Sequence, residues 1–306
     1  MKVLLATTKP FAAVAVTGIQ NIFDQAGFEL VRLEKYTEKS ALLDAVKDAD
    51  ALIVRSDIVD AEVIDAAKNL KIVVRAGAGY DNIDLAAASA KGICVMNTPG
   101  QNANAVAELV FGLLIYAKRN FFNGTSGTEL MGKKLGLHAF GNVGRAVARI
   151  AKGFNMHVYA FDAFCPAEVI EAAGVHAVAS VEDLYKTCDI VSLHIPATPQ
   201  TINSINAGLV GLMPKNGILL NTARKEVINE AELLQLMAER TDLKYIADIT
   251  PAADEQFKAQ FADRYFTTPK KMGAQTAEAN VNAGLAAANQ IVAFIKDGIR
   301  KFQVNK

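Results

Sequence analysis

The sequence carries no excess of charge of either sign, since its 32 lysine and arginine residues are balanced by 32 aspartate and glutamate residues. A chain without net charge presents no broad basic surface to nucleic acid or to an anionic membrane. We therefore expect neither of these as a partner. Any anion that this protein binds must be held by a few individually placed cations.

Long apolar runs are also missing. The best candidate, Ala105–Ala117, contains Glu108 and is shorter than the roughly 18–20 residues that a membrane-spanning helix needs. The first residues look like a strand, and Lys9-Pro10 interrupts any signal-peptide core. These features predict a cytoplasmic protein.

Cysteine is scarce, and the three residues Cys94, Cys165 and Cys188 show no C-x-x-C spacing. This pattern predicts small buried apolar side chains in a reducing compartment, with no disulfide framework. No metal ion is expected either. Low-complexity tracts and sequence repeats are also absent, although both halves of the chain show the same alternation of predicted strands and helices.

The chain is long and apolar enough for two domains, with 306 residues of which 51% are hydrophobic. Short β-branched runs alternate with amphipathic stretches, a pattern typical of parallel sheets covered by helices. The predicted strands are Lys2–Ala6, Glu29–Leu33, Ala51–Arg55, Ile72–Arg75, Ile93–Met96, Lys134–Ala139, His157–Phe161, Asp189–His194, Gly217–Asn221 and Lys244–Asp248. The predicted helices include Ala41–Ala49, Ala61–Ala67, Asn104–Arg119, Arg145–Phe154 and a long one at Ala274–Ile299.

A glycine-rich turn follows the first strand of the second half. Strand Lys134–Ala139 leads into Ala139-Phe140-Gly141-Asn142-Val143-Gly144, which is the G-x-G-x-x-G arrangement with alanine at the first glycine. Gly141 would let the backbone approach a pyrophosphate, and Gly144 would let the next helix pack closely on the strand. The N-terminus of that helix would offer N–H groups to the phosphate oxygens.

Asp162 lies at the end of the next predicted strand, 18 residues beyond Gly144. This is about where a carboxylate accepts hydrogen bonds from the ribose hydroxyls of a dinucleotide. A carboxylate there would repel a 2′-phosphate, and no arginine follows within several residues, so NAD is favoured over NADP. The plainer alternative is an ordinary strand–turn–helix with a surface aspartate. His138, just before the turn, is expected to be a packed core residue.

Further segments carry a recognisable pattern together with this turn. They are Val74–Asp84, Asn97-Thr98-Pro99 followed by Ala107-Glu108, Ser192–Pro196, Asn221–Arg224 and Gly273–Ala279. In this order, over nearly the whole chain, they resemble the D-2-hydroxyacid dehydrogenases.

The resemblance implies two doubly wound parallel-sheet domains, Rossmann-like or flavodoxin-like, with an NAD-binding domain inserted into a substrate domain. Residues 1–97 and 281–306 would form the substrate domain, and residues 98–280 the NAD-binding domain. The implied reaction moves a hydride between the nicotinamide and the hydroxyl-bearing carbon of a 2-hydroxy acid. The resemblance also implies a homodimer to which the apolar helix Asn104–Arg119 contributes, although packing of this helix in the core would give the same sequence pattern.

The resemblance also implies roles for individual residues. Arg224 matches the catalytic arginine, whose planar fork suits a carboxylate and a polarised carbonyl, although a plain surface cation is the alternative. The turn Ala76–Gly79 could offer N–H groups to the substrate carboxylate. The implied cofactor contacts are Gly141, Asn142, Val143, Gly144, Asp162, His194, Ile195, Pro196, Thr222, Ala223, Arg224, Asp248 and Gly273. The implied substrate contacts are Arg55, Arg75, Ala76, Gly77, Ala78 and Asn102, of which the two arginines would meet a phosphate or only pair with neighbouring acids.

The sequence departs from the family at the acid–base pair. The family's histidine position is held by Lys271, and its glutamate position by Ala253, with Asp254 and Glu255 adjacent. The glutamate raises the pKa of the histidine in relatives, but it would push the pKa of a lysine further from neutrality. Replacing it with alanine removes this problem, so the two losses are interpreted as one change.

Lys271 is therefore predicted to exchange the hydroxyl proton of the substrate. Lowering a lysine pKa from about 10.4 to about 8 takes roughly 3.3 kcal/mol, and one like charge about 6 Å away supplies on the order of 3 kcal/mol at an effective dielectric of about 20. Arg224 and the positive nicotinamide ring are such charges, and desolvation acts in the same direction. Lys270 is the second choice for this role. Alternatively, both lysines only anchor a substrate phosphate or lie in solvent.

The reaction expected from the resemblance is NAD-dependent oxidation of 3-phosphoglycerate to 3-phosphohydroxypyruvate, the first step of serine biosynthesis. A reductase for glyoxylate, hydroxypyruvate or another short 2-keto acid is the alternative within the same class. A binding protein that senses NAD(H) is the alternative outside it, although the retained Arg224 and the lysine at 271 argue against it. Because the chain ends shortly after its closing helix, no added regulatory domain is expected.

Overall fold

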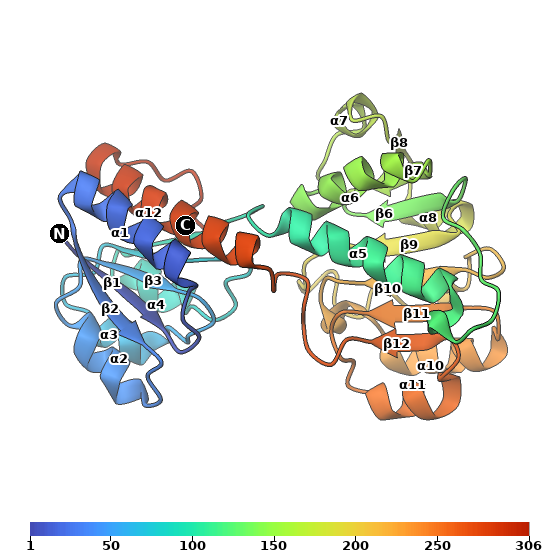
Figure 1. Cartoon of the computed structure of the whole chain (residues 1–306), viewed down its shortest axis with the longest axis horizontal. Coiled ribbons are helices and arrows are strands. Elements are labelled where there is room, and N and C mark those ends of the chain that lie inside the picture. The colour runs from blue at the N-terminus through green and yellow to red at the C-terminus, as the bar shows by residue number, and fades with distance from the viewer. Residues whose placement is uncertain (306) are drawn as a thin grey trace. The chain divides into compact units, whose positions relative to one another are not determined.

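A computed structural model describes residues 1–305 of the chain, which form two compact units (Figure 1). The first comprises Met1–Asn102 together with the chain from Gln275 onward, and the second comprises Ala103–Ala274. The chain thus changes units a few residues beyond position 97 and a few residues before position 281. Lys306, the last residue of the predicted substrate domain, lies outside the described residues.

The first unit is built on a five-stranded parallel sheet with the strand order β2-β1-β3-β4-β5. Its strands are β1 (Lys2–Thr7), β2 (Glu29–Glu34), β3 (Ala51–Val54), β4 (Ile72–Arg75) and β5 (Cys94–Asn97). Its helices are α1 (Ala13–Ala26), α2 (Lys39–Val46), α3 (Ala61–Ala66), α4 (Leu85–Ala90) and α12 (Ala277–Asp297). The strand order reverses direction between β1 and β3, as in flavodoxin-like folds.

Both faces of this sheet are buried, because successive side chains of a strand point to opposite sides. Val3 and Leu5 of β1 face the core that α1 and α12 cover, while Leu4 and Ala6 face the core under α2, α3 and α4. Helices α1 and α12, the first and last of the chain, lie side by side on one face (Figure 1). The C-terminal helix therefore completes a domain that the N-terminal strands begin.

The second unit is built on a seven-stranded parallel sheet with the order β12-β11-β10-β9-β6-β7-β8. Its strands are β6 (Lys134–His138), β7 (His157–Phe161), β8 (His176–Ala177), β9 (Ile190–Leu193), β10 (Ile218–Asn221), β11 (Lys244–Ala247) and β12 (Tyr265–Thr267). Its helices are α5 (Ala103–Lys118), η1 (Asn120–Phe122), α6 (Asn142–Gly153), α7 (Ala167–Ala172), α8 (Val181–Thr187), α9 (Ala207–Val210), η2 (Lys225–Val227), α10 (Glu230–Glu239) and α11 (Asp254–Phe261). This is the Rossmann order extended by one strand, with its reversal between β6 and β9.

Two apolar cores cover the two faces of this second sheet. Helices α5, α6 and α7 pack on one face, and α8, α9, α10 and α11 pack on the other. Both sheets are wholly parallel and covered on both sides, so the predicted fold class is confirmed. Within residues 1–305, no helix combines the length and the apolar character that crossing a membrane requires.

One expectation about the cysteines needs correction. Cys94 and Cys188 are buried free thiols, whereas Cys165 is only half-buried. It lies outside the core because it belongs to the loop between β7 and α7, where Arg145 Nη2 donates to its sulfur at 3.4 Å.

Candidate active site

The glycine-rich turn connects β6 to α6 in the second unit. Ala139 has a positive φ of 89°, an unusual conformation for a residue with a side chain, at the position where the pattern has its first glycine. A Cβ on Gly144 would lie 2.4 Å from the carbonyl oxygen of Ala139, so the first turn of α6 requires glycine there. A Cβ on Gly141 would meet no atom within 4 Å, and its φ of −73° is ordinary. Protein packing therefore does not account for glycine at position 141.

Asp162 follows β7 directly and holds the turn in place. Its Oδ2 accepts a hydrogen bond from Phe140 N at 2.7 Å, and its Oδ1 accepts from Phe164 N at 2.8 Å and from Cys165 N at 2.9 Å. A carboxylate has about four lone-pair positions, so one more donor such as a ribose hydroxyl can be accommodated.

The remaining predicted cofactor contacts of this unit follow the carboxyl ends of β9, β10 and β11, the edge at which doubly wound sheets bind ligands. His194, Ile195 and Pro196 follow β9, and Thr222–Arg224 follow β10. His194 Nε2 and Thr222 Oγ1 are buried and have no hydrogen-bond partner among residues 1–305. Burial, with a smaller contribution from His138, lowers the pKa of His194 to about 3, so its ring is neutral near pH 7.

Asn221, at the end of β10, shapes the segment that carries Arg224. Its Oδ1 accepts from Ala223 N at 2.9 Å and its Nδ2 donates to Arg224 O at 2.8 Å. The guanidinium of Arg224 turns back, and Nη1 donates to the carbonyl oxygen of Ala223 at 3.0 Å. The predicted catalytic arginine thus sits on a tight, braced turn.

Asp248, at the end of β11, holds the loop that carries Lys271. The buried carboxylate accepts from Thr268 Oγ1 at 2.9 Å, from Met272 N at 2.8 Å and from Gly273 N at 2.7 Å. Gly273 fits closely here, since a Cβ on it would lie 3.0 Å from Asp248 Oδ2. The loop is therefore fixed immediately after Lys271.

Lys271 and Arg224 converge on one atom. Lys271 Nζ donates to the carbonyl oxygen of Ala223 at 3.5 Å, and Arg224 Nη1 donates to the same oxygen at 3.0 Å. The two distances place the two nitrogen atoms at most about 6.5 Å apart. Lys270 is exposed, and no hydrogen bond from its ammonium group joins it to the described residues. The structure therefore brings Lys271, not Lys270, to the arginine.

The acids beside position 253 are engaged elsewhere. Asp254 accepts from Lys258 Nζ at 2.6 Å and from the Tyr265 hydroxyl at 2.7 Å, and Glu255 is 93% exposed with an oxygen 4.0 Å from Lys258. Both are turned toward Lys258 on their own helix. Sequence adjacency alone made them candidates to replace the family's glutamate, and their observed partners remove that basis.

Arg55, a predicted substrate contact in the first unit, makes no ion pair with any described residue. Its Nη1 donates to the carbonyl oxygens of Lys9 at 2.9 Å and Pro10 at 3.1 Å, and its Nη2 donates to Asn280 Oδ1. The guanidinium lies 5.1 Å from the centre of the Phe11 ring, and burial lowers its pKa. Asp57 attracts this guanidinium without forming an ion pair, so pairing with a neighbouring acid and binding of a phosphate both stay open for Arg55. Sequence gave no signal for Asn280, which lies 225 positions away.

The turn after β4 offers fewer amides than expected. Ala76 N donates to Val54 O at 2.8 Å and Gly77 N donates to Arg75 O at 2.9 Å, so only Ala78 and Gly79 have amides without a bond to described residues. A Cβ on Gly77 would lie 1.3 Å from Arg75 Nη1, so glycine lets that guanidinium cross the turn. Arg75 Nε donates to Arg55 O at 2.9 Å. Asn102 is half-buried and ends the first of the two segments that form this unit.

Nearly the whole chain matches a known family. The model of the D-isomer specific 2-hydroxyacid dehydrogenase catalytic domain matches residues 9–305. The chain belongs to this family. The chain is similar to the solved structure of NAD⁺-bound 3-phosphoglycerate dehydrogenase from Entamoeba histolytica, with a TM-score of 0.91 and 46% identity over 100% of this chain and 99% of that chain.

Two relatives show the range of activities among similar chains. The chain is 37% identical over 284 residues to D-3-phosphoglycerate dehydrogenase of Methanocaldococcus jannaschii, and the match covers 87% of this chain and 54% of that protein. It is 36% identical over 284 residues to hydroxypyruvate reductase of Thermotoga maritima, covering 86% of this chain and 90% of that protein. The chain thus spans about half the length of the first relative and most of the second.

Proposed function

We propose that this dehydrogenase oxidises 3-phosphoglycerate to 3-phosphohydroxypyruvate with NAD, the step that opens serine biosynthesis. The observation that carries the proposal is the convergence of Arg224 and Lys271 on the carbonyl oxygen of Ala223, beside the cofactor edge of a Rossmann sheet. The similarity to an NAD⁺-bound 3-phosphoglycerate dehydrogenase supports the choice of cofactor and substrate.

The residues of the second unit fit a dinucleotide. The turn at Gly141 leaves room for a pyrophosphate at the N-terminus of α6, and Asp162 can accept one further hydrogen bond from a ribose. The partnerless Thr222 Oγ1 and His194 Nε2 could bond polar groups of the same ligand. When bound, NAD would accept the hydride that leaves the hydroxyl-bearing carbon of the substrate.

Arg224 and Lys271 would have different roles in the reaction. The guanidinium of Arg224 would bind the substrate carboxylate and polarise the oxygen on the reacting carbon. A neutral Lys271 Nζ would take the hydroxyl proton during oxidation, and the resulting ammonium would return it during reduction. The positive charge of Arg224, at most about 6.5 Å away, favours the neutral form of the lysine.

Arg55 and Arg75 are the proposed partners of the substrate phosphate. Arg55 brings a half-buried guanidinium that makes no ion pair with the described residues, which suits a bound dianion. The amides of Ala78 and Gly79 would serve the carboxylate. Anchoring of the phosphate by Lys271 is the alternative role for that lysine.

Reduction of hydroxypyruvate or glyoxylate is a second candidate function. It is favoured by the similarity to the Thermotoga maritima hydroxypyruvate reductase, because the match covers 90% of the length of that protein. The same arginine and lysine would serve this reaction, since it also interconverts a 2-hydroxy acid and a 2-keto acid.

A substrate panel separates the two candidates. Initial rates would be measured with 3-phosphoglycerate, D-glycerate and D-lactate plus NAD, and with hydroxypyruvate and glyoxylate plus NADH. The first proposal predicts that kcat/KM for 3-phosphoglycerate exceeds that for D-glycerate at least 100-fold, and that Arg55→Met removes most of this preference. Equal rates with and without the phosphate would contradict the first proposal and support the second.

A homodimer remains part of the proposal. Helix α5 buries eight residues in the second unit but leaves Ile115 exposed, and Phe122 and Met131 nearby are more than 60% exposed. Light scattering coupled to gel filtration should give twice the mass of 32.7 kDa. A single-chain mass at 50 µM protein would contradict it.

A further inference from the structure

A second group of cations lies at the opposite edge of the sheet from the proposed cofactor site. A cavity of about 370 Å³ is lined by residues around the amino ends of β6, β10 and β11. Four of them are Lys118, Lys133, Lys215 and Lys244. Parallel strands of four or five residues separate the two edges by roughly 13–17 Å, so this cavity is distinct from the strand ends that carry Asp248 and Arg224.

The positive charge of this cavity is poorly balanced. Lys118, Lys133 and Lys215 form no ion pair or side-chain hydrogen bond with the described residues. Among the described residues, Lys244 Nζ donates only to neutral oxygens, Ala117 O at 2.9 Å and Asn120 Oδ1 at 3.1 Å. Four ammonium groups therefore share one concave surface.

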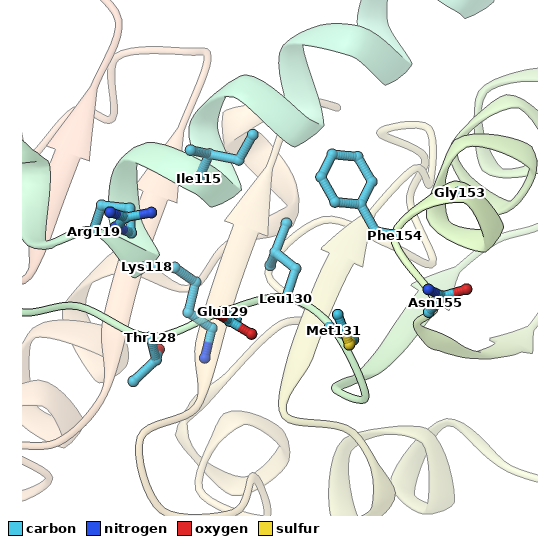
Figure 2. A pocket seen from close by; sticks show the side chains of 10 residues that line it. All are labelled: Ile115, Lys118, Arg119, Thr128, Glu129, Leu130, Met131, Gly153, Phe154 and Asn155. Carbon is cyan, nitrogen blue, oxygen red and sulfur yellow. The ribbon is translucent and has the colours of Figure 1, made fainter.

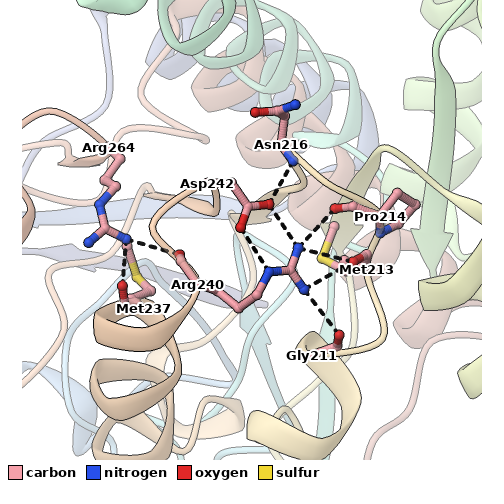
Figure 3. Close-up of polar contacts among 8 residues, drawn as sticks. All are labelled: Gly211, Met213, Pro214, Asn216, Met237, Arg240, Asp242 and Arg264. Carbon is pink, nitrogen blue, oxygen red and sulfur yellow. Dashed lines mark hydrogen bonds and ion pairs between the residues drawn. The ribbon is translucent and has the colours of Figure 1, made fainter.

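The two carboxylates on the wall offset little of this charge. Asp242 is held by Arg240, whose Nε and Nη2 donate to its two oxygens at 2.8 Å each (Figure 3). Asp189 accepts a backbone hydrogen bond from Lys134 N at 2.9 Å and is the one lining acid without an arginine. Asp263 adds a weaker attraction for Lys244 from outside the cavity.

The lysines also interact unfavourably with one another. Burial, together with the positive charges of Lys133 and Lys244, lowers the pKa of Lys118, while Asp189 opposes this shift. Burial likewise lowers the pKa of Lys244. Lys118 also lines a second, mostly apolar cavity of about 400 Å³ beside Leu130 and Phe154 (Figure 2).

The walls are fixed before any ligand arrives. A Cβ on Gly127 would lie 2.3 Å from Lys118 O, and Thr128 N donates to the same oxygen at 2.8 Å, so the loop crosses the end of α5 closely. On the other side, Arg240 donates to the carbonyl oxygens of Gly211 and Pro214, both at 3.2 Å (Figure 3). Binding would therefore require little ordering of the chain.

We propose that this lysine-lined cavity is a binding site for a compact small molecule with two phosphate-type groups. The volume suits a small ligand, the charge suits several anionic oxygens, and Ile218 is the one apolar side chain on the wall, which leaves little surface for a nucleoside base. The proposal is independent of the catalytic roles given to Arg224 and Lys271.

Pyrophosphate is the probe for the test. Isothermal titration would be done at constant ionic strength and saturating NAD, which keeps the probe from the Gly141 turn. We expect one site per chain, at least fivefold tighter for pyrophosphate than for inorganic phosphate. Lys118→Met with Lys133→Met should weaken pyrophosphate binding at least tenfold. The matched control Lys152→Met with Lys186→Met, which removes two exposed lysines of the same unit, should stay within twofold.

Other outcomes would overturn the assignment. If the pocket double variant and the control double variant bound pyrophosphate equally tightly, the cavity would not be the binding site. Absence of pyrophosphate binding to the parent protein at saturating NAD would likewise contradict the proposal. Tighter binding of a hexaglutamate peptide than of pyrophosphate would point to a protein partner instead. Should the pocket double variant lose its far-UV circular dichroism, the exposed Lys215→Met alone should still weaken binding about threefold, and unchanged affinity would contradict the proposal.

Discussion

Asp162 and Asp248 act on the backbone of the loops beside them. Each buried or half-buried carboxylate accepts three hydrogen bonds, most of them from main-chain N–H groups. Asp248 bonds the amides of Met272 and Gly273, so it determines where Lys271 stands relative to Arg224. A single buried carboxylate thereby positions a side chain that it does not touch.

His138 makes the stability of the second unit dependent on pH. Burial lowers the pKa of its ring to about 4, with Asp162 opposing the shift, and its Nδ1 lies 3.3 Å from the Tyr185 hydroxyl. The unfolded chain binds a proton at a pKa near 6.5, so the folded state loses stability as pH falls from 6.5 to about 4. The loss attributable to this ring is up to about 3 kcal/mol.

Urea unfolding of the protein and of His138→Gln at pH 7.0, 5.5 and 4.5 measures this contribution. The variant should lose less stability than the parent between pH 7.0 and 4.5. His157→Gln, which removes an exposed ring at the start of β7, serves as the control and should follow the parent. Identical pH dependence of the parent and His138→Gln would contradict this account.

Glycines in and beside helix α6 are expected to have different roles, one in packing and one in NAD binding. In Gly144→Ala the new methyl would meet a backbone oxygen at 2.4 Å, so we expect a loss of about 1–3 kcal/mol in the free energy of unfolding. In Gly141→Ala it would meet nothing within 4 Å, so stability should change by less than about 1 kcal/mol while NAD affinity falls at least tenfold. Gly153→Ala, also in open space, should change neither NAD affinity nor, by more than about 1 kcal/mol, stability.

Thermal unfolding and NAD titration of these three variants provide the test. Unchanged NAD affinity in Gly141→Ala would show that no pyrophosphate approaches this turn.

The elements were predictable where local pattern determines them. The strands at 72–75 and 157–161 have the predicted bounds, and the other predicted strands differ by one residue at one end or at both. Helix α6 begins at Asn142 instead of Arg145, because the glycine turn supplies its cap and first turn together. Helix α12 begins at Ala277, where the Thr276 side chain accepts from Ala279 N, and ends before Gly298 with φ 69°. Strands β8 and β12, of two and three residues, are too short to show a pattern.

Site residues were predictable as positions but not as contacts. The motifs indicated Asp162, Asp248 and Arg224, yet which backbone groups these side chains bond depends on loops distant in sequence. The four lysines of the second cavity gave no signal, because they are scattered from position 118 to 244 and meet only when the strands align. Likewise, the bond from Arg55 to Asn280 requires the chain to return to the first unit.

The first unit of the molecule depends on the last helix of the chain. Ala283, Ala287, Ala288 and Ile291 of α12 are buried against residues of α1 and the first sheet. Ala288→Asp would bury an unpaired carboxylate there and should destabilise this unit by about 3 kcal/mol or more. The second unit has its own cores, so NAD affinity should stay within threefold.

Calorimetry of Ala288→Asp with and without NAD would show whether the unfolding transition of the first unit shifts while that of the second unit does not. The exposed neighbour Asn289→Asp is the matched control and should shift stability by no more than about 0.5 kcal/mol. Loss of NAD binding in folded Ala288→Asp protein would contradict the independence of the two units.

The pH–rate profile of Lys271→Met with 3-phosphoglycerate and NAD tests the central claim most directly. Loss of a positioned acid–base group predicts that kcat falls about 10²–10⁴-fold and that the rise of rate with pH disappears. Lys270→Met, which changes the neighbouring exposed lysine, should keep kcat within threefold and the same profile. Full turnover by Lys271→Met with an unchanged profile would contradict the account, and a raised KM with unchanged kcat would assign the lysine to phosphate anchoring instead.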